Sequence, residues 1–396
     1  MEKLILPGTL RGSVTLPPSK SEVHRALICA ALCEGETTVL CRSPADDIAA
    51  TAGGLRALGA AVDYRDEKYY VNKILPAERA VMDCGESGST LRFLLPLAAA
   101  LGIETEFLCR GRLAERPMEP LLEVLNANGC TVFSRGDAFL LRGRLQPGCY
   151  GLDASASSQF LTGLLLALPL LPGGSIKLLG FLTSKDYVNL TAAVMARFGV
   201  EAGCTDGAYT AAGAYCSPGS YAPEGDWSAA ANWLTAKALG SAVTVDGLNP
   251  ESLQGDRAVT GLITAICRGG AVIDAGNVPD LVPPLTVLAA LTPGETRFTN
   301  ASRLRQKESD RLASLTAMLQ ALGGDCAETA DGLIIRGVPS LRGGTVDSCG
   351  DHRIAMAAAV AATVCREPVA LLGAECVTKS YPAFWSDFAE LGGKAE

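Results

Sequence analysis

Six segments of the chain share one form, in which an amphipathic helical pattern stops at a glycine and a short strand pattern follows. The glycines are Gly59, Gly129, Gly199, Gly269, Gly323 and Gly392. Glycine is the usual residue just past the last helical turn, because it adopts left-handed backbone conformations easily. The intervals between them are 70, 70, 70, 54 and 69 residues. Any α/β protein ends some helices in glycine, but the shared period favours six repeat units of βα type and a mixed α/β fold.

The length and composition of the chain permit two domains of ordinary size. It has 396 residues, of which 48% are hydrophobic and 19% charged, so we expect a large core and no extensive disorder. Two proline-containing breaks, "TLPPSK" at 15–20 and "YAPEGDW" at 221–227, are candidate crossings between domains. A chain that crosses at both would join residues 1–17 to 223–396 and leave 18–222 as the second domain.

The charge balance argues against a general nucleic-acid binder. The net charge is −8, whereas such a binder shows a broad basic face. Zinc-site spacing is absent, since there is no Cys-x-x-Cys and only two histidines. The N-terminus lacks the pattern of a signal peptide, and the longest apolar runs, such as 160–171, are too short to span a membrane. We therefore expect a soluble, cytoplasmic protein.

The chain has 14 cysteines, an even number that could suggest disulfides. Several of them instead lie in or beside apolar, Ala/Leu-rich runs, where a free thiol behaves as a small hydrophobe. These are Cys29, Cys33, Cys130, Cys267, Cys326 and Cys365. We therefore predict reduced cysteines.

The segment "RLRQKESDRL" at residues 303–312 places three cations four residues apart, at Arg303, Lys307 and Arg311. On a helix they would share one stripe and repel each other by roughly 0.2–0.5 kcal/mol per pair. Either neighbouring acids such as Glu308 and Asp310 neutralise the stripe, or an external anion does. In the second case, alanine at Lys307 or Arg311 would reduce activity far more than stability.

Clusters of cationic and hydroxyl side chains stand at other expected helix starts, where free N–H groups and the macrodipole favour an anion. They comprise Lys20, Ser21 and Arg25; Gly85, Gly88 and Arg92; Arg110, Arg112 and Arg116; Ser155, Ser157, Ser158 and Gln159; Ser184, Lys185 and Tyr187; Asp351, His352 and Arg353; and Lys379. Each cluster alone can be read as ordinary capping, with Ser19, Ser21 or Asp351 as the N-cap residue. Together, in an acidic chain, they indicate a site for multiply anionic substrates.

These segments, in this order, closely resemble the enolpyruvyl transferases, and within them the branch that acts on shikimate-3-phosphate. The resemblance runs from about Lys3 to Gly392. It rests on "SKSEVHRAL", "GESGSTLR", "RLAERPMEPL", "SASSQFLTGLL", "SKDY", "RLRQKESDRL" and "GDHRIAM". It implies a two-domain inside-out α/β barrel of six βαβαββ units, three in each domain, with the active site in the cleft between the domains.

The implied reaction transfers the enolpyruvyl group of phosphoenolpyruvate to the 5-hydroxyl of shikimate-3-phosphate. It releases phosphate through a tetrahedral intermediate, and the protein acts as a monomer without cofactor or metal. The implied shikimate-3-phosphate ligands are Lys20, Ser21, Arg25, Ser157, Ser158, Gln159, Ser184, Tyr187, Asp280 and Lys307. The implied phosphoenolpyruvate ligands are Lys20, Gly88, Arg112, Gln159, Arg311, Arg353 and Lys379. The implied catalytic residues are Lys20, the base Asp280 and the acid Glu308.

Two of these roles meet competing expectations from the residues themselves. Asp280 lies in a proline-rich turn, where an acid is more often a turn or cap residue than a base. Glu308 would need a raised pKa to act as an acid, whereas neighbouring Lys307 and Arg311 would lower it.

One residue departs from the family pattern. The glycine-rich turn often reads Gly-Asn-x-Gly in this family, but here Glu86 stands in place of the asparagine. An ionised glutamate cannot donate a hydrogen bond to a substrate anion, so Glu86 must turn away, pair with a cation such as Arg112, or be protonated.

Three alternative functions remain open on the sequence. An enzyme that transfers enolpyruvate to UDP-N-acetylglucosamine would typically carry a catalytic cysteine after the "GRxR"-like segment, where this chain has "LAERP". A non-catalytic binder of phosphorylated metabolites would not need both Asp280 and Glu308. An RNA-cyclase relative would need a catalytic histidine, and only His24 and His352 are available.

Overall fold

The computed structural model describes all residues from 1 to 396, and the chain divides into two compact units. The discontinuous unit comprises Met1–Pro17 and Glu224–Glu396, and the continuous unit comprises Pro18–Pro223. Both division points fall in the proline-containing breaks, the second within one residue of the position expected from the sequence. Each unit buries its own hydrophobic cluster, from Val23 to Tyr221 in one and from Ile5 to Leu391 in the other.

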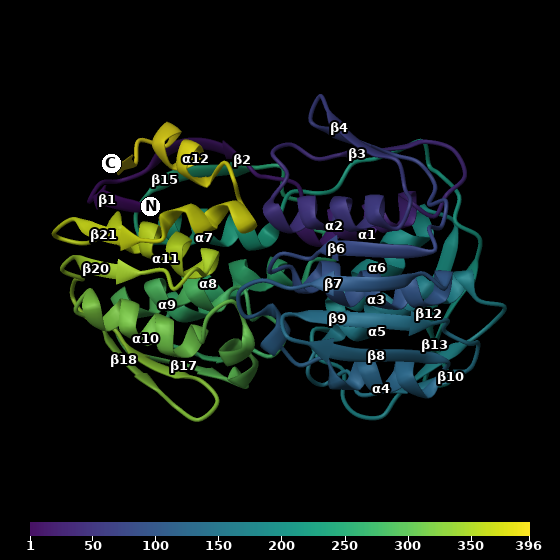
Figure 1. Ribbon diagram of the computed structural model, residues 1–396. Helices are drawn as coiled ribbons and strands as arrows, with labels where there is room; N and C mark the ends of the chain where they lie inside the picture. The colour runs from purple at the N-terminus through teal and green to yellow at the C-terminus, as the bar shows by residue number, and fades with distance from the viewer. The chain divides into compact units, whose positions relative to one another are not determined.

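The continuous unit holds three four-stranded sheets and six α-helices (Figure 1). Its helices are α1 (Lys20–Ala30), α2 (Asp46–Ala57), α3 (Gly88–Leu101), α4 (Glu119–Ala127), α5 (Ser158–Ala167) and α6 (Lys185–Arg197), with 3₁₀ helices η1 (Leu113–Glu115) and η2 (Leu168–Leu170). Its strands are β3 (Thr37–Leu40), β4 (Val62–Arg65), β5 (Lys68–Val71), β6 (Arg79–Asp83), β7 (Glu104–Leu108), β8 (Cys130–Arg135), β9 (Ala138–Gly143), β10 (Cys149–Leu152), β11 (Ser175–Leu178), β12 (Val200–Thr205), β13 (Ala208–Gly213) and β14 (Ser220–Tyr221).

The discontinuous unit holds two four-stranded sheets, one two-stranded sheet and six α-helices. Its helices are α7 (Trp227–Ala238), α8 (Val259–Cys267), α9 (Val282–Leu291), α10 (Arg311–Ala321), α11 (His352–Ala362) and α12 (Phe384–Glu390), with 3₁₀ helices η3 (Gly255–Ala258), η4 (Ser302–Gln306) and η5 (Ala374–Lys379). Its strands are β1 (Glu2–Leu6), β2 (Arg11–Thr15), β15 (Ala242–Asp246), β16 (Val272–Asp274), β17 (Glu295–Thr299), β18 (Asp325–Glu328), β19 (Leu333–Arg336), β20 (Gly344–Asp347), β21 (Val369–Leu372) and β22 (Lys394–Ala395).

Every four-stranded sheet has the same order, a parallel pair followed by an antiparallel hairpin. In the order β6-β7-β9-β8, for example, β6 and β7 are parallel, while β9 is antiparallel to both β7 and β8. The connections between β6, β7 and β8 contain α3 and α4, so the unit reads βαβαββ. The predicted α/β repeat architecture is therefore confirmed.

One of the six units is shorter than the others. Strands β2 and β15 form only a parallel pair, and α8 leads directly into β16, the first strand of the next sheet. The missing hairpin explains why Gly269 and Gly323 are only 54 residues apart. All six predicted glycines follow helix ends and have positive φ, between 81° and 111°.

Three helices in each unit are buried along most of their length: α1, α3 and α5 in one, and α7, α9 and α11 in the other. Their sequences are rich in alanine and leucine on every face, as expected for helices without a solvent side. At Gly163 of α5, a Cβ atom would lie 2.2 Å from the carbonyl oxygen of Arg92 in α3, so only glycine permits this close approach. The approach brings the starts of α3 and α5 together.

The cysteines are all free thiols, as predicted. Of the six that were expected to behave as small hydrophobes, five are buried, but Cys267 is exposed at the end of α8. The missing hairpin after α8 leaves that helix end without a covering sheet. No helix of the chain is both long and apolar enough to cross a membrane.

Candidate active site

The candidate residues stand at or just before helix N-termini in both units. In a βαβ unit each helix follows the carboxyl end of a strand, so the helix starts of one unit lie toward the same edge of its sheets. Free backbone N–H groups at those starts attract anions and acidic side chains. We describe the two units separately.

The segment 303–312 is not one helix, and the prediction of a single cationic stripe is wrong. Arg303 lies in η4, Lys307 has an extended backbone, and α10 begins at Arg311. Asp310 is the N-cap of α10, because its carboxylate accepts a hydrogen bond from the Ala313 N–H at 3.2 Å. The chain therefore breaks between the cations, and their interactions come from other segments.

Arg311 is the centre of the charge cluster in the discontinuous unit. Its side chain is only 2% exposed. It donates at 2.7 Å to each of three carboxylates: Asp280, Glu308 and Asp351. Although burial lowers its pKa, these carboxylates raise it above the ordinary value. The acids that were expected to neutralise the segment are thus only partly local, since Asp280 and Asp351 lie far away in the sequence.

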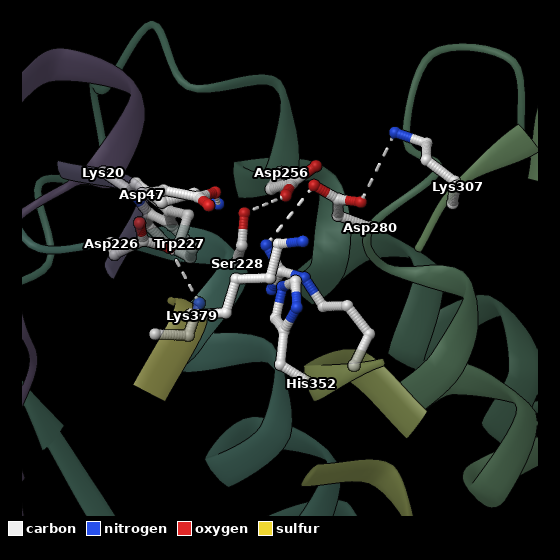
Figure 2. Close-up of polar contacts among 12 residues, drawn as sticks. Lys20, Asp47, Asp226, Trp227, Ser228, Asp256, Asp280, Lys307, His352 and Lys379 are labelled. Carbon is white, nitrogen blue, oxygen red and sulfur yellow. Dashed lines mark hydrogen bonds and ion pairs between the residues drawn. The ribbon is translucent and has the colours of Figure 1, made fainter. Parts of the chain in front are cut away.

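Asp280 lies in the turn before α9 and faces several cations (Figure 2). Besides Arg311, it accepts a hydrogen bond from Arg353 at 3.3 Å and lies 3.9 Å from the Lys307 ammonium. Burial raises its pKa, but Arg353, Lys307 and Arg311 outweigh burial and hold the pKa well below its usual range. Asp280 is therefore ionised at neutral pH.

Lys307 titrates closer to neutrality than an ordinary lysine. Burial lowers its pKa to about 8, with help from Arg311 and Arg303, while Asp280 and Glu308 oppose the shift. Arg303 does not lie on a shared helix with Lys307, but it donates to the Gly276 carbonyl at 3.3 Å. Lys307 therefore loses much of its charge as the pH rises above 8.

Two further predicted cations belong to the same cluster. Lys379, at the end of η5, is buried with its ammonium 3.5 Å from a carboxylate oxygen of Glu308. Arg353 lies in the first turn of α11, and Asp351 caps that helix by accepting from the Arg353 N–H at 2.9 Å. Asp351 thus combines the capping role with its bond to Arg311.

The sequence analysis missed Asp256, a carboxyl beside this cluster. It lies in η3, is 1% exposed and accepts a hydrogen bond from Ser228. A recurrent signal could have found it. The pairs Gly225-Asp226, Gly255-Asp256 and Gly350-Asp351 each precede a helical segment, and only the third was recognised.

In the continuous unit, the start of α1 is held by a mixture of charged and neutral partners. Lys20 forms an ion pair with Asp47 at 2.6 Å, a partner that the sequence analysis missed. Arg25 is buried and donates to three neutral oxygens: Thr191 Oγ1 at 2.8 Å, the Ser21 carbonyl at 2.6 Å and the Tyr187 carbonyl at 3.1 Å. Burial lowers the pKa of Arg25 to about 10. Ser19 occupies the N-cap position without a side-chain capping bond.

Gln159 links the starts of α3 and α5. Its carbonyl oxygen accepts from Arg92 at 2.8 Å, and its amide nitrogen donates to Ser89 at 3.0 Å. Gly88 lies beside this pair, since a Cβ atom there would be 3.5 Å from Arg92 Nη1 and 3.6 Å from the Gln159 carbonyl oxygen. The structure therefore brings together two residues, Gly88 and Gln159, that the sequence analysis had assigned from separate motifs.

The serines at α5 and α6 start their helices. Ser157 is the N-cap of α5 and accepts from the Gln159 N–H at 3.3 Å, while Ser158 is buried in the first turn. Ser184 is the residue before α6 and has a left-handed backbone with φ of 50°. This conformation is uncommon outside glycine and asparagine and is concentrated at functional sites. The chain then turns into α6, where Tyr187 supplies the carbonyl that binds Arg25.

Glu86 and Arg112 lie on adjacent loops. The Glu86 side chain covers Gly111, where a Cβ atom would be 1.8 Å from its carboxylate oxygen. The Arg110 N–H donates to the Gly85 carbonyl at 2.7 Å and joins the two loops. Arg112 is 41% exposed and has Glu115 at 3.5 Å. Glu86 thus lies over the backbone of the loop that carries Arg112.

A buried chain of polar side chains connects α1, α2 and α3. His24 Nδ1 is 2.7 Å from Thr51 Oγ1, which is 2.7 Å from Thr90 Oγ1, and Thr90 donates to Ser87 Oγ at 2.8 Å. Burial lowers the pKa of His24 to about 3, so the ring is neutral. Ser87 is the N-cap of α3, which begins at Gly88. The chain therefore supports the glycine-rich turn with hydroxyl groups.

Comparisons with known proteins agree with this arrangement. The model of the EPSP synthase (3-phosphoshikimate 1-carboxyvinyltransferase) family matches residues 6–388. The 3-phosphoshikimate 1-carboxyvinyltransferase of Clostridium kluyveri is 40% identical over 420 aligned residues, which cover 99% of this chain and 97% of that protein. The protein of the same name from Clostridium acetobutylicum is also 40% identical, with coverage of 98% and 97%.

Solved structures show the same fold. The EPSP synthase from Acinetobacter baumannii matches with a TM-score of 0.78 and 24% identity over 100% of this chain and 99% of that one. The enolpyruvyl transferase NikO from Streptomyces tendae matches with a TM-score of 0.77 and 18% identity, over 100% and 98%. The family match over nearly the whole length, joined to the two clusters described above, shows that this chain belongs to the EPSP synthase family.

Proposed function

We propose that this chain transfers the enolpyruvyl group of phosphoenolpyruvate to the 5-hydroxyl of shikimate-3-phosphate and releases phosphate. The observation that carries the proposal is the double bond of Arg311, which holds Asp280 and Glu308 at 2.7 Å each. A protein that only binds phosphorylated metabolites has no use for two carboxylates among its cations. An enzyme that moves protons at two positions of its substrates needs both.

Asp280 is the proposed base. Its low pKa keeps it ionised, so it accepts a hydrogen bond from the 5-hydroxyl and takes the proton as the oxygen bonds to C2 of phosphoenolpyruvate. Glu308 is the proposed acid, and it gives a proton to the methylene carbon C3 in the same addition. The products of this step are the tetrahedral intermediate, protonated Asp280 and ionised Glu308.

The second step reverses the proton transfer at carbon. Glu308 removes a proton from the methyl group while the bond between C2 and the phosphate oxygen breaks, which restores the double bond and releases phosphate. Cations stabilise the charge on the substrates and on the departing phosphate, because interactions with charged groups are strong at sites from which water is excluded. The proposed phosphoenolpyruvate cations are Lys20, Arg112, Arg311, Arg353 and Lys379, with the Gly88 backbone and Gln159 beside them.

The neutral donors of the continuous unit suit the second substrate, which carries hydroxyl groups as well as a phosphate and a carboxylate. Serine and glutamine side chains both donate and accept hydrogen bonds, so they can recognise a polyol. The proposed shikimate-3-phosphate ligands are Lys20, Ser21, Arg25, Ser157, Ser158, Gln159, Ser184 and Tyr187, together with Lys307 and Asp280 of the discontinuous unit.

Phosphorus NMR tests this proposal. The purified protein is incubated with phosphoenolpyruvate and shikimate-3-phosphate, and in a parallel tube with phosphoenolpyruvate and UDP-N-acetylglucosamine. Inorganic phosphate and a new enolpyruvyl ester are expected only in the first tube. Turnover in the second tube alone would assign the chain to the other substrate, and shikimate-3-phosphate binding without turnover would make it a binding protein.

We also propose a monomer in the cytoplasm. The 14 free cysteines support this location, because disulfides are rare where thiols are kept reduced. Light scattering coupled to size-exclusion chromatography should give the mass of one chain, about 41.0 kDa. A dimer mass would overturn the monomer.

A further inference from the structure

Asp256 is a buried carboxyl to which the proposed reaction gives no role. Ser228 of α7 donates to its Oδ2 atom, and its Oδ1 atom is buried without a hydrogen-bond partner (Figure 2). A buried carboxylate oxygen without a donor is costly, whereas a protonated carboxyl needs fewer donors. The surroundings of Asp256 therefore favour its neutral form.

The groups that face Asp256 come from several elements. Asp226 precedes α7, Asp280 precedes α9, and Arg353 lies in α11. Helix α8, which follows η3 directly, carries no charged residue. Arg257, the neighbour of Asp256 in η3, is exposed and donates to the Pro250 carbonyl instead. Arg353 is thus the cation available to Asp256.

Arg353 also serves Asp280, with only one contact between them. Its Nη2 atom donates to Asp280 at 3.3 Å, while its Nε atom is buried without a partner. A guanidinium carries five N–H groups in a fixed fork, so a turn of the side chain can exchange one carboxylate for another. Asp256 and Asp280 are the two candidates for this exchange.

We propose that Asp256 is a positioning residue that competes with Asp280 for Arg353, and that the proton on Asp256 decides the competition. With the proton present, Arg353 stays bound to Asp280 and available to phosphoenolpyruvate. Once Asp256 ionises, it draws Arg353 toward itself and weakens both functions. The inference rests on the proposed function, in which Arg353 binds phosphoenolpyruvate.

The change falls in a useful pH range. Burial raises the pKa of Asp256 to about 7, and Asp280 raises it too, while the bond from Ser228 and the charge of Arg353 oppose the shift. At pH 6 most molecules hold the proton, and at pH 8.5 few do. The kcat/KM for phosphoenolpyruvate should therefore decrease as the pH rises through about 7.

The test compares wild type with Asp256→Asn, which has the shape of the protonated carboxyl but cannot ionise. The quantity measured is the ratio of variant to wild-type kcat/KM for phosphoenolpyruvate, from pH 6 to 8.5. This ratio cancels the ionisations of the substrates and of Lys307, which both proteins share. We expect it to rise at least about fivefold over this range, since about 97% of a group with a pKa near 7 is ionised at pH 8.5. A constant or falling ratio would overturn the proposal.

Ser228→Ala supplies a second, opposite test of the same contact. The Ser228 hydroxyl stabilises the ionised carboxylate, so its loss should move the decline of kcat/KM to higher pH. Asp246→Asn is the matched control, because Ser13 donates to Asp246 at 2.6 Å in an exposed pair of the same kind. The control should follow wild type at every pH. A decline at unchanged pH in Ser228→Ala would contradict the assignment to Asp256.

Thermal melting without substrates separates this inference from the proposed function. A carboxyl whose folded-state pKa exceeds its unfolded-state value loses stabilising proton uptake as the pH rises between the two values. Asp256→Asn should therefore melt higher than wild type at pH 8 and differ less at pH 5. A lower melting temperature at pH 8 would show that Asp256 is a needed ionised partner, which overturns the inference. Absence of turnover in wild type would overturn the proposed function and leave this melting result unaffected.

Discussion

The two candidate clusters balance their buried charges in different ways. In the discontinuous unit, Arg311 is bound to three carboxylates, so charge meets charge. In the continuous unit, Arg25 is equally buried but bonds only to neutral hydroxyl and carbonyl oxygens. The first arrangement leaves little net charge near Arg311, whereas the second leaves the positive charge of Arg25 uncompensated by its hydrogen-bond partners.

The difference indicates a division of labour. Ionised acids that move protons must be held in place, and ion pairs with Arg311 hold two of them. A cation that binds an anionic substrate should keep its charge available, and bonds to neutral oxygens orient Arg25 without neutralising it. The predictions below test whether loss of a residue costs mainly stability in the first cluster and mainly affinity in the second.

The largest effect on stability is expected from Arg311→Met. The substitution leaves three carboxylates without their shared cation, and breaking a buried ion pair on one side costs about 3–5 kcal/mol of unfolding free energy. Urea unfolding measures it. This expectation differs from the sequence-based one for Arg311, because Arg311 is buried among carboxylates and Lys307 is not. The control is Arg297→Met, an exposed arginine that pairs with Glu295 and should matter little. A loss below about 1 kcal/mol for Arg311→Met would contradict the ion-pair account.

Arg25→Met is expected to cost affinity more than stability. Its neutral partners lose one donor each, which amounts to about 1–3 kcal/mol of unfolding free energy. The loss of shikimate-3-phosphate affinity should exceed tenfold, measured by titration calorimetry. Arg56→Met is the control in the same unit, since Arg56 also donates to a carbonyl, that of Val62 at 2.7 Å. Equal affinities for wild type and Arg25→Met would remove Arg25 from the binding site.

Lys307 should make shikimate-3-phosphate binding depend on pH. Its pKa is about 8, so it is charged below that pH and increasingly neutral above it. Affinity should therefore be lower at pH 9 than at pH 7, and the bound anion should raise the pKa so that binding takes up a proton. Calorimetry in two buffers of different ionisation enthalpy measures both quantities. If Lys307→Met retains the same decrease in affinity, another group is responsible.

The smallest effect is expected from Thr51→Val, which interrupts the hydroxyl chain between His24 and Thr90. It leaves buried polar atoms without partners at a cost of about 1–2 kcal/mol, well below that of Arg311→Met. Thermal or urea unfolding measures the loss. Because all partners are neutral, the cost should not change between pH 6 and 8. A strong pH dependence would mean that His24 is charged in the folded protein.

Much of the fold could be predicted from the sequence, because the six glycines report a local backbone requirement that needs no knowledge of tertiary contacts. The short sixth unit was visible in the 54-residue interval but was not recognised. The helix expected across 303–312 was wrong because the spacing of the cations outweighed a better signal. Ser309 and Asp310 precede the apolar pattern of α10, and Asp310 is its N-cap.

The candidate site was only partly predictable. Helix starts with serine, glycine and basic residues were found from composition, but their partners depend on contacts between distant segments. The bonds of Arg311 to Asp280 and Asp351 span 31 and 40 residues. Asp256 and Asp47 were missed because a single acid beside a helix reads as a cap until its burial is known.

The central claim is that Glu308 protonates the methylene carbon of phosphoenolpyruvate, and mass spectrometry of the enolpyruvyl product formed in D₂O tests it most directly. Wild type should place deuterium in the product methylene group. Glu308→Gln should form product at least about 100-fold more slowly, as expected for loss of a general acid. The exposed control Glu390→Gln should behave as wild type. Product without deuterium, or an undiminished rate in Glu308→Gln, would contradict the account.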